Sequence, residues 1–152
     1  MTRVFRRRPS VAFWISLGLM LLIAGRLWFS PRTDSSVPTP GEYRVVRVLD
    51  GLRLEVVAEA DKQAHRVRLI GIEPTDLKAA TAWLNERVAE KVVRLEMDKR
   101  RVDANGCWLA YVYLNSTFIN AELVRHGWAK YVPYPGDSSR HAKEFAIAAK
   151  GK

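Results

Sequence analysis

The sequence is poor in cysteine and histidine, which excludes several classes of small protein. Cys107 is the single cysteine among 152 residues, so no intrachain disulfide can form. Three histidines, His65, His126 and His141, are scattered, and neither they nor the cysteine has the spacing of a metal-ligand motif. The chain also lacks internal repeats. A disulfide scaffold, a zinc module and a repeat array are therefore excluded.

Acidic residues are absent from residues 1–32, and the middle of that segment has no charge at all. Four arginines precede residues 10–29, a run of about 20 residues, which is the length that a membrane-spanning helix needs. Its one charge, Arg26, lies near the far end, where a long side chain can reach the interface. We therefore predict a basic cytoplasmic N-terminus at residues 1–9 and a transmembrane anchor at residues 10–30.

The arginine cluster also predicts the orientation of the chain, because positively charged flanks stay in the cytoplasm. The residues after the anchor then lie outside the cytoplasmic membrane, in a single-pass arrangement with the membrane as a partner. A cleaved secretory signal, which would leave a secreted domain, has the same basic start and apolar middle. It remains an alternative, although Ala24-Gly25-Arg26 is a poor cleavage site. A buried helix of a soluble domain is a third interpretation.

Most of the basic charge belongs to this N-terminal segment. The whole chain carries a net charge of +9, but residues 1–32 hold six arginines and no acid. The remaining residues have 19 basic and 16 acidic side chains, a net charge of +3. The outer domain is only mildly basic, and its charge alone is a weak indication of nucleic-acid binding.

Residues 31–41 contain three prolines and small polar residues without apolar periodicity, which is typical of a linker. Residues 42–152 are then one domain, large enough for a modest core. Alternation predicts strands, and helical spacing predicts helices. The expected strands are 43–57 with a bend at Asp50-Gly51, 66–72, 92–97 and 108–113; the expected helices are 77–90, 121–126 and 139–150. A small antiparallel barrel with helices against it is the simplest way to bury these faces.

Local signals also predict how these elements begin and turn. We expect Thr75, Asn120 and either Ser138 or Ser139 to cap the three helices. Asn105-Gly106 indicates a two-residue hairpin. The apolar face of the last helix is expected to contain Ala142, Phe145, Ala146 and Ala149.

The stretch from His65 to Asp76 carries the most suggestive chemistry. Arg68 projects from a strand shortly before two acids, Glu73 and Asp76, at the strand's end. This arrangement can hold a phosphate and a cation together, and it is also an ordinary way for a charged strand to leave a barrel.

Four stretches resemble the staphylococcal-nuclease-like (thermonuclease) family in sequence and order. They are VRVLDG at 46–51, VRLIGIE at 67–73, DANG at 103–106 running into LAYVY at 109–113, and INAELVRHGWA at 119–129. The resemblance covers nearly all of residues 43–150. It implies an α+β fold, namely a five-stranded OB-type β-barrel with three helices, and calcium-dependent cleavage of phosphodiesters in nucleic acid.

The resemblance also implies roles for individual residues. The first phosphate-clamping arginine falls on Arg68, a metal-binding carboxylate on Glu73, and the acid that directs the attacking water on Asp76, which is one methylene shorter than the family's glutamate. The family's Asp-Gly-Asp-Thr signature falls on residues 50–53, so Leu52 replaces a metal ligand. Cys107 replaces the second clamping arginine.

These departures suggest a degenerate catalytic site. Arg53 and Arg101 are candidates to compensate, but we expect Arg53 to be on the wrong phase of its strand and Arg101 to lie across the hairpin. We interpret Cys107 as an inert residue rather than a nucleophile or redox thiol. Aromatic residues that can stack on bases are expected mainly in the core: Trp108, Tyr111, Tyr113 and Trp128.

Three functions remain open. The first is a membrane-anchored, catalytically impaired module that binds nucleic acid or another ligand. The second is a weak metal-dependent phosphodiesterase in which Arg68, Glu73 and Asp76 still act. The third is a structural partner of another envelope protein. No cofactor is expected for the first and third, whereas the second implies Ca²⁺.

Overall fold

The computed structural model describes residues 37–58, 62–133 and 140–151, all of which belong to one compact unit, Asp34–Lys152. The predicted N-terminus at 1–9, the anchor at 10–30 and the first part of the linker lie outside the described residues. Within the described residues, no helix is long and apolar enough to cross a membrane.

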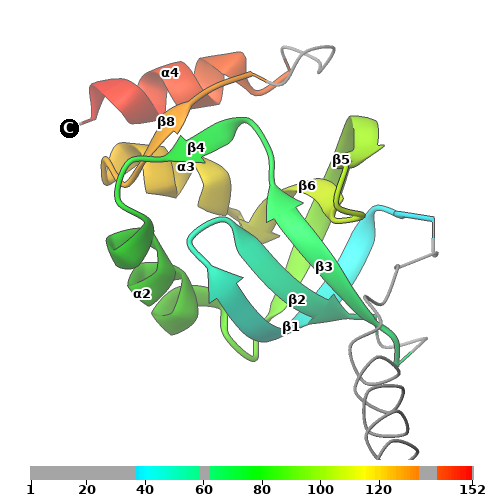
Figure 1. The fold of residues 1–152 in the computed structure, drawn as a ribbon. Helices are drawn as coiled ribbons and strands as arrows, with labels where there is room; N and C mark the ends of the chain where they lie inside the picture. Colours follow the sequence, from blue (N-terminus) through cyan, green and yellow to red (C-terminus); the bar gives the residue numbers. More distant parts are fainter. Residues whose placement is uncertain (1–36, 59–61, 134–139, 152) are drawn as a thin grey trace, which may run out of the picture. The chain divides into compact units, whose positions relative to one another are not determined.

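Five strands form a closed β-barrel (Figure 1). Hydrogen-bonded neighbours follow the order β3-β2-β1-β5-β6, and a parallel pairing of β3 with β6 closes the barrel. The strands are β1 (Gly41–Asp50), β2 (Arg53–Val57), β3 (Ala64–Leu69), β5 (Val92–Val102) and β6 (Trp108–Leu114). The short strand β7 (Thr117–Phe118) pairs antiparallel with the end of β6, and β4 (Ile72–Pro74) pairs with β8 (Ala129–Tyr131) outside the barrel.

Three helices complete the described part of the chain: α2 (Leu77–Val88), α3 (Ile119–Arg125) and α4 (Ala142–Lys150). Figure 1 shows α2 beside the β1–β2 hairpin, and α3 and α4 gathered with β4 and β8. The predicted five-stranded barrel with three helices is confirmed.

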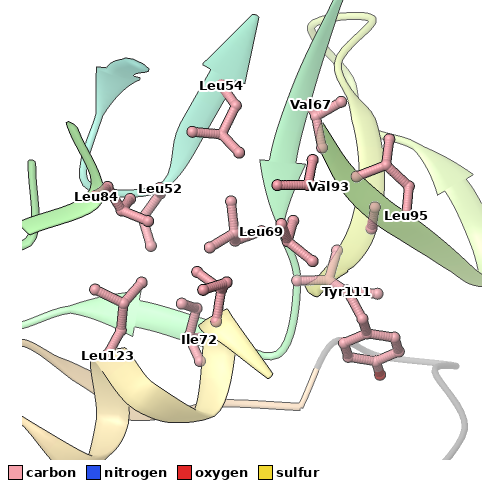
Figure 2. Close-up of a cluster of buried hydrophobic side chains, with 14 of the residues drawn as sticks. Leu52, Leu54, Val67, Leu69, Ile72, Leu84, Val93, Leu95, Tyr111 and Leu123 are labelled. Atoms are coloured by element: carbon pink, nitrogen blue, oxygen red, sulfur yellow. The ribbon is translucent and has the colours of Figure 1, made fainter. Parts of the chain in front are cut away.

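The core fills the barrel because apolar residues alternate along its strands, and the helices add their own apolar faces (Figure 2). On α2 the residues Ala80, Leu84 and Val88 are buried, but Leu77 is exposed. Gly51, at the β1–β2 turn, lies so close to α2 that an added Cβ would sit 2.6 Å from the Cβ of Ala80. The hairpin turn is therefore seated directly on the helix.

The predicted strand at 66–72 is broken in two. β3 ends at Leu69, Gly71 adopts a left-handed φ of 75°, and β4 begins at Ile72. The chain leaves the barrel here to pair with β8. A continuous apolar sequence concealed this break, because periodicity does not reveal a change of partner strand.

Two predicted helix caps are wrong. Asp76 rather than Thr75 caps α2: its side chain accepts a hydrogen bond from the Ala79 amide at 2.9 Å. Asn120 lies inside α3, is fully buried, accepts from the Val112 amide and donates to the Ile70 carbonyl, each at 2.9 Å. It thus satisfies backbone groups at the place where β3 diverges from β6.

The loop between β5 and β6 is longer than the predicted two-residue hairpin. Val102 pairs with Trp108, which leaves residues 103–107 in the loop. The Asp103 Oδ1 atom accepts from the amides of Asn105 at 2.8 Å and Cys107 at 2.9 Å. An aspartate side chain that bonds to the backbone ahead of it organises this loop, in place of the compact turn that Asn105-Gly106 suggested.

The last helix begins at Ala142, after the predicted start at residue 139. Ser138 and Ser139, the expected caps, lie outside the described residues. Its buried residues are Phe145 and Ala148, whereas Ala146 and Ala149 are exposed. Glu96 on β5 holds the start of this helix: it accepts from Arg140 Nη1 at 2.6 Å and lies 3.1 Å from His141 Nε2.

Candidate functional site

Two arginines stand opposite each other on adjacent strands of the barrel. In the antiparallel pairing of β2 with β3, Arg53 is the direct partner of Arg68. Directly opposed residues place their side chains on the same face of a sheet. The prediction that Arg53 lies on the wrong phase is therefore wrong. The pairing of β2 with β3 is regular, so Arg53 and Arg68 lie on the face opposite the buried Leu54 and Val67.

Arg53 is oriented by an ion pair with Asp50. Arg53 Nε donates to Asp50 Oδ2 at 2.6 Å, and Nη2 contacts the same oxygen. Asp50 Oδ1 accepts from the Leu52 amide at 2.9 Å, so the carboxylate itself is fixed. The hydrogen bond that Arg53 donates to Asp50, followed by the charge of Asp50, raises the pKa of Arg53. Its side chain nevertheless remains 53% exposed, so a ligand can reach it.

Arg68 is available for a ligand in a different way. It is half-buried on β3 and has no ion-pair or hydrogen-bond partner among the described residues. A partly buried arginine without an acidic partner holds an uncompensated charge, which favours an anion nearby. Arg101, the other arginine considered from the sequence, instead donates to the Pro38 carbonyl at 3.1 Å.

Cys107 lies within the electrostatic reach of these arginines, as the resemblance implied for a site residue. Burial raises the pKa of its thiol and so does Asp103, while the charges of Arg53, Arg66 and Arg68 oppose the rise. The net pKa is raised, so the thiol is neutral at neutral pH. A protonated, 5% exposed thiol is neither a nucleophile nor a replacement for a guanidinium.

Leu52 is part of the core rather than of the polar site. It is 7% exposed, and it is drawn with the other buried side chains in Figure 2. Its backbone carbonyl accepts from the Leu69 amide at 2.9 Å, which ties the turn to β3. The side chain that replaces the family's metal ligand thus contributes apolar packing to the core.

The two acids predicted for the site have structural partners of their own. Glu73 on β4 lies 3.4 Å from the Lys130 ammonium across the β4–β8 pair. Asp76 caps α2. Among the described residues, neither acid forms an ion pair or hydrogen bond with Arg68. The structure therefore brings Arg68 together with Arg53 and Cys107, and gives Glu73 and Asp76 to neighbouring elements.

This donor set does not fit a calcium ion. Calcium takes roughly six to eight oxygen ligands, mainly from carboxylates. Leu52 offers none, Glu73 is paired with a lysine, and Asp76 is bonded to a helix amide. In the part of the chain that the structure describes, no three histidine, cysteine, aspartate or glutamate side chains come together to hold a metal.

The closed barrel with three helices agrees with the fold that the family resemblance implies, and Arg68 lies near the end of β3. The chain belongs to the staphylococcal nuclease homologue family, whose model matches residues 66–151. It is similar to the thermonuclease of Staphylococcus intermedius, with 34% identity over 117 residues that cover 69% of this chain and 68% of the relative. It is also similar to the thermonuclease of Staphylococcus hyicus, with 26% identity over 137 residues that cover 76% of this chain and 80% of the relative. The resemblance inferred from four stretches of sequence is confirmed.

Arg53 is the residue that sequence reasoning undervalued. The signal was present, because the signature at residues 50–53 gains an arginine where the family has a threonine, in a chain that loses an arginine at position 107. Strand pairing was needed to see that the gained charge and the lost charge belong to one place.

Proposed function

We propose that this domain binds the phosphate backbone of nucleic acid and that its calcium-dependent cleavage is impaired. The observation that carries the proposal is the placement of Arg53 opposite Arg68, beside the neutral Cys107. Arg53 supplies the charge that the family's second clamping arginine would provide. Under this proposal the domain binds the phosphates of nucleic acid but cleaves phosphodiesters poorly.

The geometry suits a phosphodiester. Directly opposed residues have Cβ atoms roughly 5 Å apart, so two guanidinium groups can approach oxygens of the same phosphate or of neighbouring ones. Guanidinium groups match phosphate oxygens in planar, two-point contacts. The ion pair with Asp50 keeps the Arg53 side chain in place before a ligand arrives. Asp50 also competes with phosphate for the Arg53 guanidinium.

Impaired cleavage follows from the same residues. A phosphodiester gains negative charge in the transition state, and fixed positive groups must be arranged around it. Losing one such electrostatic stabiliser costs on the order of 10² to 10³ in rate. Arg53 is engaged by Asp50, and Asp76 is both short and committed to the helix cap. Binding tolerates these changes better than catalysis, which requires placement within a fraction of an ångström.

The test uses the full chain, a fluorescent single-stranded oligonucleotide, and either Ca²⁺ or a chelator. We expect binding that weakens as salt rises, and no cleavage above background in Ca²⁺. Arg68→Ala should weaken binding, while Lys143→Ala on the exposed surface of α4 should leave it unchanged. A chain that binds no oligonucleotide at any salt concentration would refute the proposal.

The second candidate is a weakly active phosphodiesterase. It is favoured by the similarity to proteins named thermonuclease and by the retention of Arg68, Glu73 and Asp76. Under this candidate Ca²⁺ is the cofactor. Cleavage in Ca²⁺ that disappears in Arg68→Ala would establish it and overturn the impairment.

We further propose that residues 10–30 anchor the domain in a membrane, with residues 1–9 in the cytoplasm and the barrel outside. The support is the sequence pattern alone. The nucleic acid, or another envelope protein as partner, would then be met outside the cytoplasm. The chain should stay in membranes after an alkaline wash, with its barrel open to protease from outside. Release as a shorter soluble chain would favour the cleaved signal.

A further inference from the structure

A cluster of three aromatic rings lies on the side of α2 that faces the α3–β8 connection. Trp83 comes from α2, while His126 and Trp128 lie between α3 and β8. The rings of His126 and Trp128 are stacked, with centroids 4.5 Å apart and planes 14° from parallel. The Trp83 ring is tilted against both, at 5.5 Å from His126 and 5.9 Å from Trp128.

This cluster is partly open to solvent, as is Tyr113, which was expected in the core and is only partly buried against it. Trp108 and Tyr111 are 2% and 3% exposed and belong to the core, as predicted. Trp83 and Trp128 are only partly buried against that core, and His126 is exposed. The expectation of a core position is therefore only half met for Trp128.

The cluster is bordered by positive charge. The Arg87 guanidinium lies 5.8 Å from the centre of the Trp83 ring. Lys130, two residues after Trp128, is exposed and pairs with Glu73 at 3.4 Å. A partner that offers flat rings and negative charge would complement this surface, and a single-stranded nucleic acid offers both.

Contacts also connect the cluster to elements that flank the candidate phosphate site. The amides of Thr75 and Asp76 donate to the Trp128 carbonyl at 2.8 and 3.1 Å, so Trp128 is fixed to the turn that carries Asp76. On α2, Ala80 supports the turn that precedes Arg53, and Trp83 is its neighbour three residues along the helix. The helix α2 therefore contacts the turn before Arg53 and carries the Trp83 ring.

We propose that Trp83, His126 and Trp128 form a platform on which the bases of a single strand stack, while Arg53 and Arg68 hold its phosphates. This inference rests on the proposed function, and it assigns the surface of the domain that contacts the bases. Stacking needs an exposed base face, which a duplex does not offer along its length. A nearby arginine strengthens such a surface through its attraction to aromatic faces.

The experiment compares the full chain on three fluorescent probes of equal length: an oligothymidylate, an abasic strand with the same backbone, and a duplex. The abasic strand keeps the phosphates and lacks the bases. Because each stacked base is worth about 5- to 100-fold in affinity, the oligothymidylate should bind at least several-fold more tightly than the abasic strand. The duplex should bind more weakly than the oligothymidylate.

Two variants and one control locate the effect. Trp128→Leu removes the ring but keeps an apolar side chain, and His126→Ala alters an exposed side chain, so the second reports even where the first fails to fold. Both should reduce the preference for bases over the abasic strand and leave abasic binding unchanged. Leu77→Ala, a change at an exposed apolar residue of the same helix, should keep the preference. Arg53→Ala with Arg68→Ala should weaken binding of both strands alike.

The outcomes distinguish base stacking on the three rings from phosphate binding by Arg53 and Arg68. Equal binding of the oligothymidylate and the abasic strand would overturn the platform while leaving phosphate binding in place. Failure to bind either strand would overturn both. If His126→Ala abolished binding to vesicles of anionic lipid and left the base preference intact, the rings would serve a lipid surface and the inference would be wrong.

Discussion

Replacing Arg53 and Arg68 together by alanine should remove two phosphate contacts without disturbing the core. Both side chains lie on the outer face of the barrel, and neither residue is among its buried residues. Asp50 loses its ionic partner in the double variant, but its other oxygen still accepts from the Leu52 amide. The perturbation is therefore confined to the charge that a nucleic acid would meet.

The magnitude follows from the release of counterions. Each phosphate neutralised on a single strand adds about 0.7 to the slope of log affinity against log salt, so the double variant should lose about 1.4 from that slope. Between about 50 and 200 mM salt, the original chain should therefore lose roughly sevenfold more affinity than the variant. This difference in salt dependence separates phosphate contacts from a general loss of folded protein.

The assay is fluorescence anisotropy of a labelled single strand over a series of salt concentrations. Lys143→Ala removes one exposed positive charge from α4 and should leave the slope unchanged. Asp50→Asn should act in the opposite direction, because it removes the anion that competes for Arg53 while keeping an acceptor for the Leu52 amide. Binding should then tighten.

Two results would refute the reasoning. Identical slopes for the original chain and the double variant would mean that Arg53 and Arg68 do not contact phosphate. A loss in Lys143→Ala as large as the loss in the double variant would mean that binding follows overall charge rather than this site.

Three further predictions concern other residues. A triple variant should restore part of the calcium-dependent cleavage; its substitutions are Leu52→Asp, Asp76→Glu and Cys107→Arg. It should also have a lower thermal midpoint of unfolding, since the substitutions bury a carboxylate and remove a helix cap worth about 1 kcal/mol. A folded variant without cleavage would contradict the mapping of the turn at Asp76. The neutral thiol of Cys107 should react slowly with iodoacetamide near pH 7 and faster at alkaline pH, and rapid labelling of the native chain would disprove its protonation. Burial raises the pKa of Glu96, but the hydrogen bonds from Arg140 and His141 lower it by more. The net pKa therefore lies below the ordinary value of 4.5. Its contribution to stability is therefore present above pH 4.5 and lost as the pH falls through the lower folded pKa, so urea unfolding of the original chain and Glu96→Gln should differ most above that pH.

Most of the fold could be predicted because its signals are local. The alternation of Val93, Leu95 and Met97 and the spacing of Ala80, Leu84 and Val88 each indicate one buried face. These patterns depend only on the geometry of a single strand or helix. They therefore held where the surrounding structure followed that geometry.

The errors arose where one element depends on another. The break after Leu69 follows from pairing with β8, and the role of Asn120 from the backbone groups that β3 and β6 leave between them. The choice between Thr75 and Asp76 as cap was decided by the Gly127 carbonyl, to which the Thr75 hydroxyl donates at 2.6 Å. None of these partners is visible in a local pattern.

The candidate site shows the same division. The positions of Arg68, Leu52 and Cys107 came from the family resemblance, and the structure places Arg68 and Cys107 near each other. Arg53 was misjudged because its partner, Arg68, is set by the register between β2 and β3, which no local pattern shows. The partners of Glu73 and Asp76 were not predicted, because they come from β8 and from the first turn of α2.

The parallel pairing of β3 with β6 has a consequence for how the domain responds to its ligand. It joins Val67 to Trp108, segments far apart in the sequence, and such contacts carry a large entropic cost during folding. Arg68 stands on one strand of this closure, and Cys107 immediately precedes the other. A phosphate chain bound to both Arg53 and Arg68 would need β2 and β3 paired, so it would bind the closed barrel and not the unfolded chain. Thermodynamic linkage then makes resistance to unfolding rise with ligand concentration, so the barrel reports occupancy of the site without any cleavage.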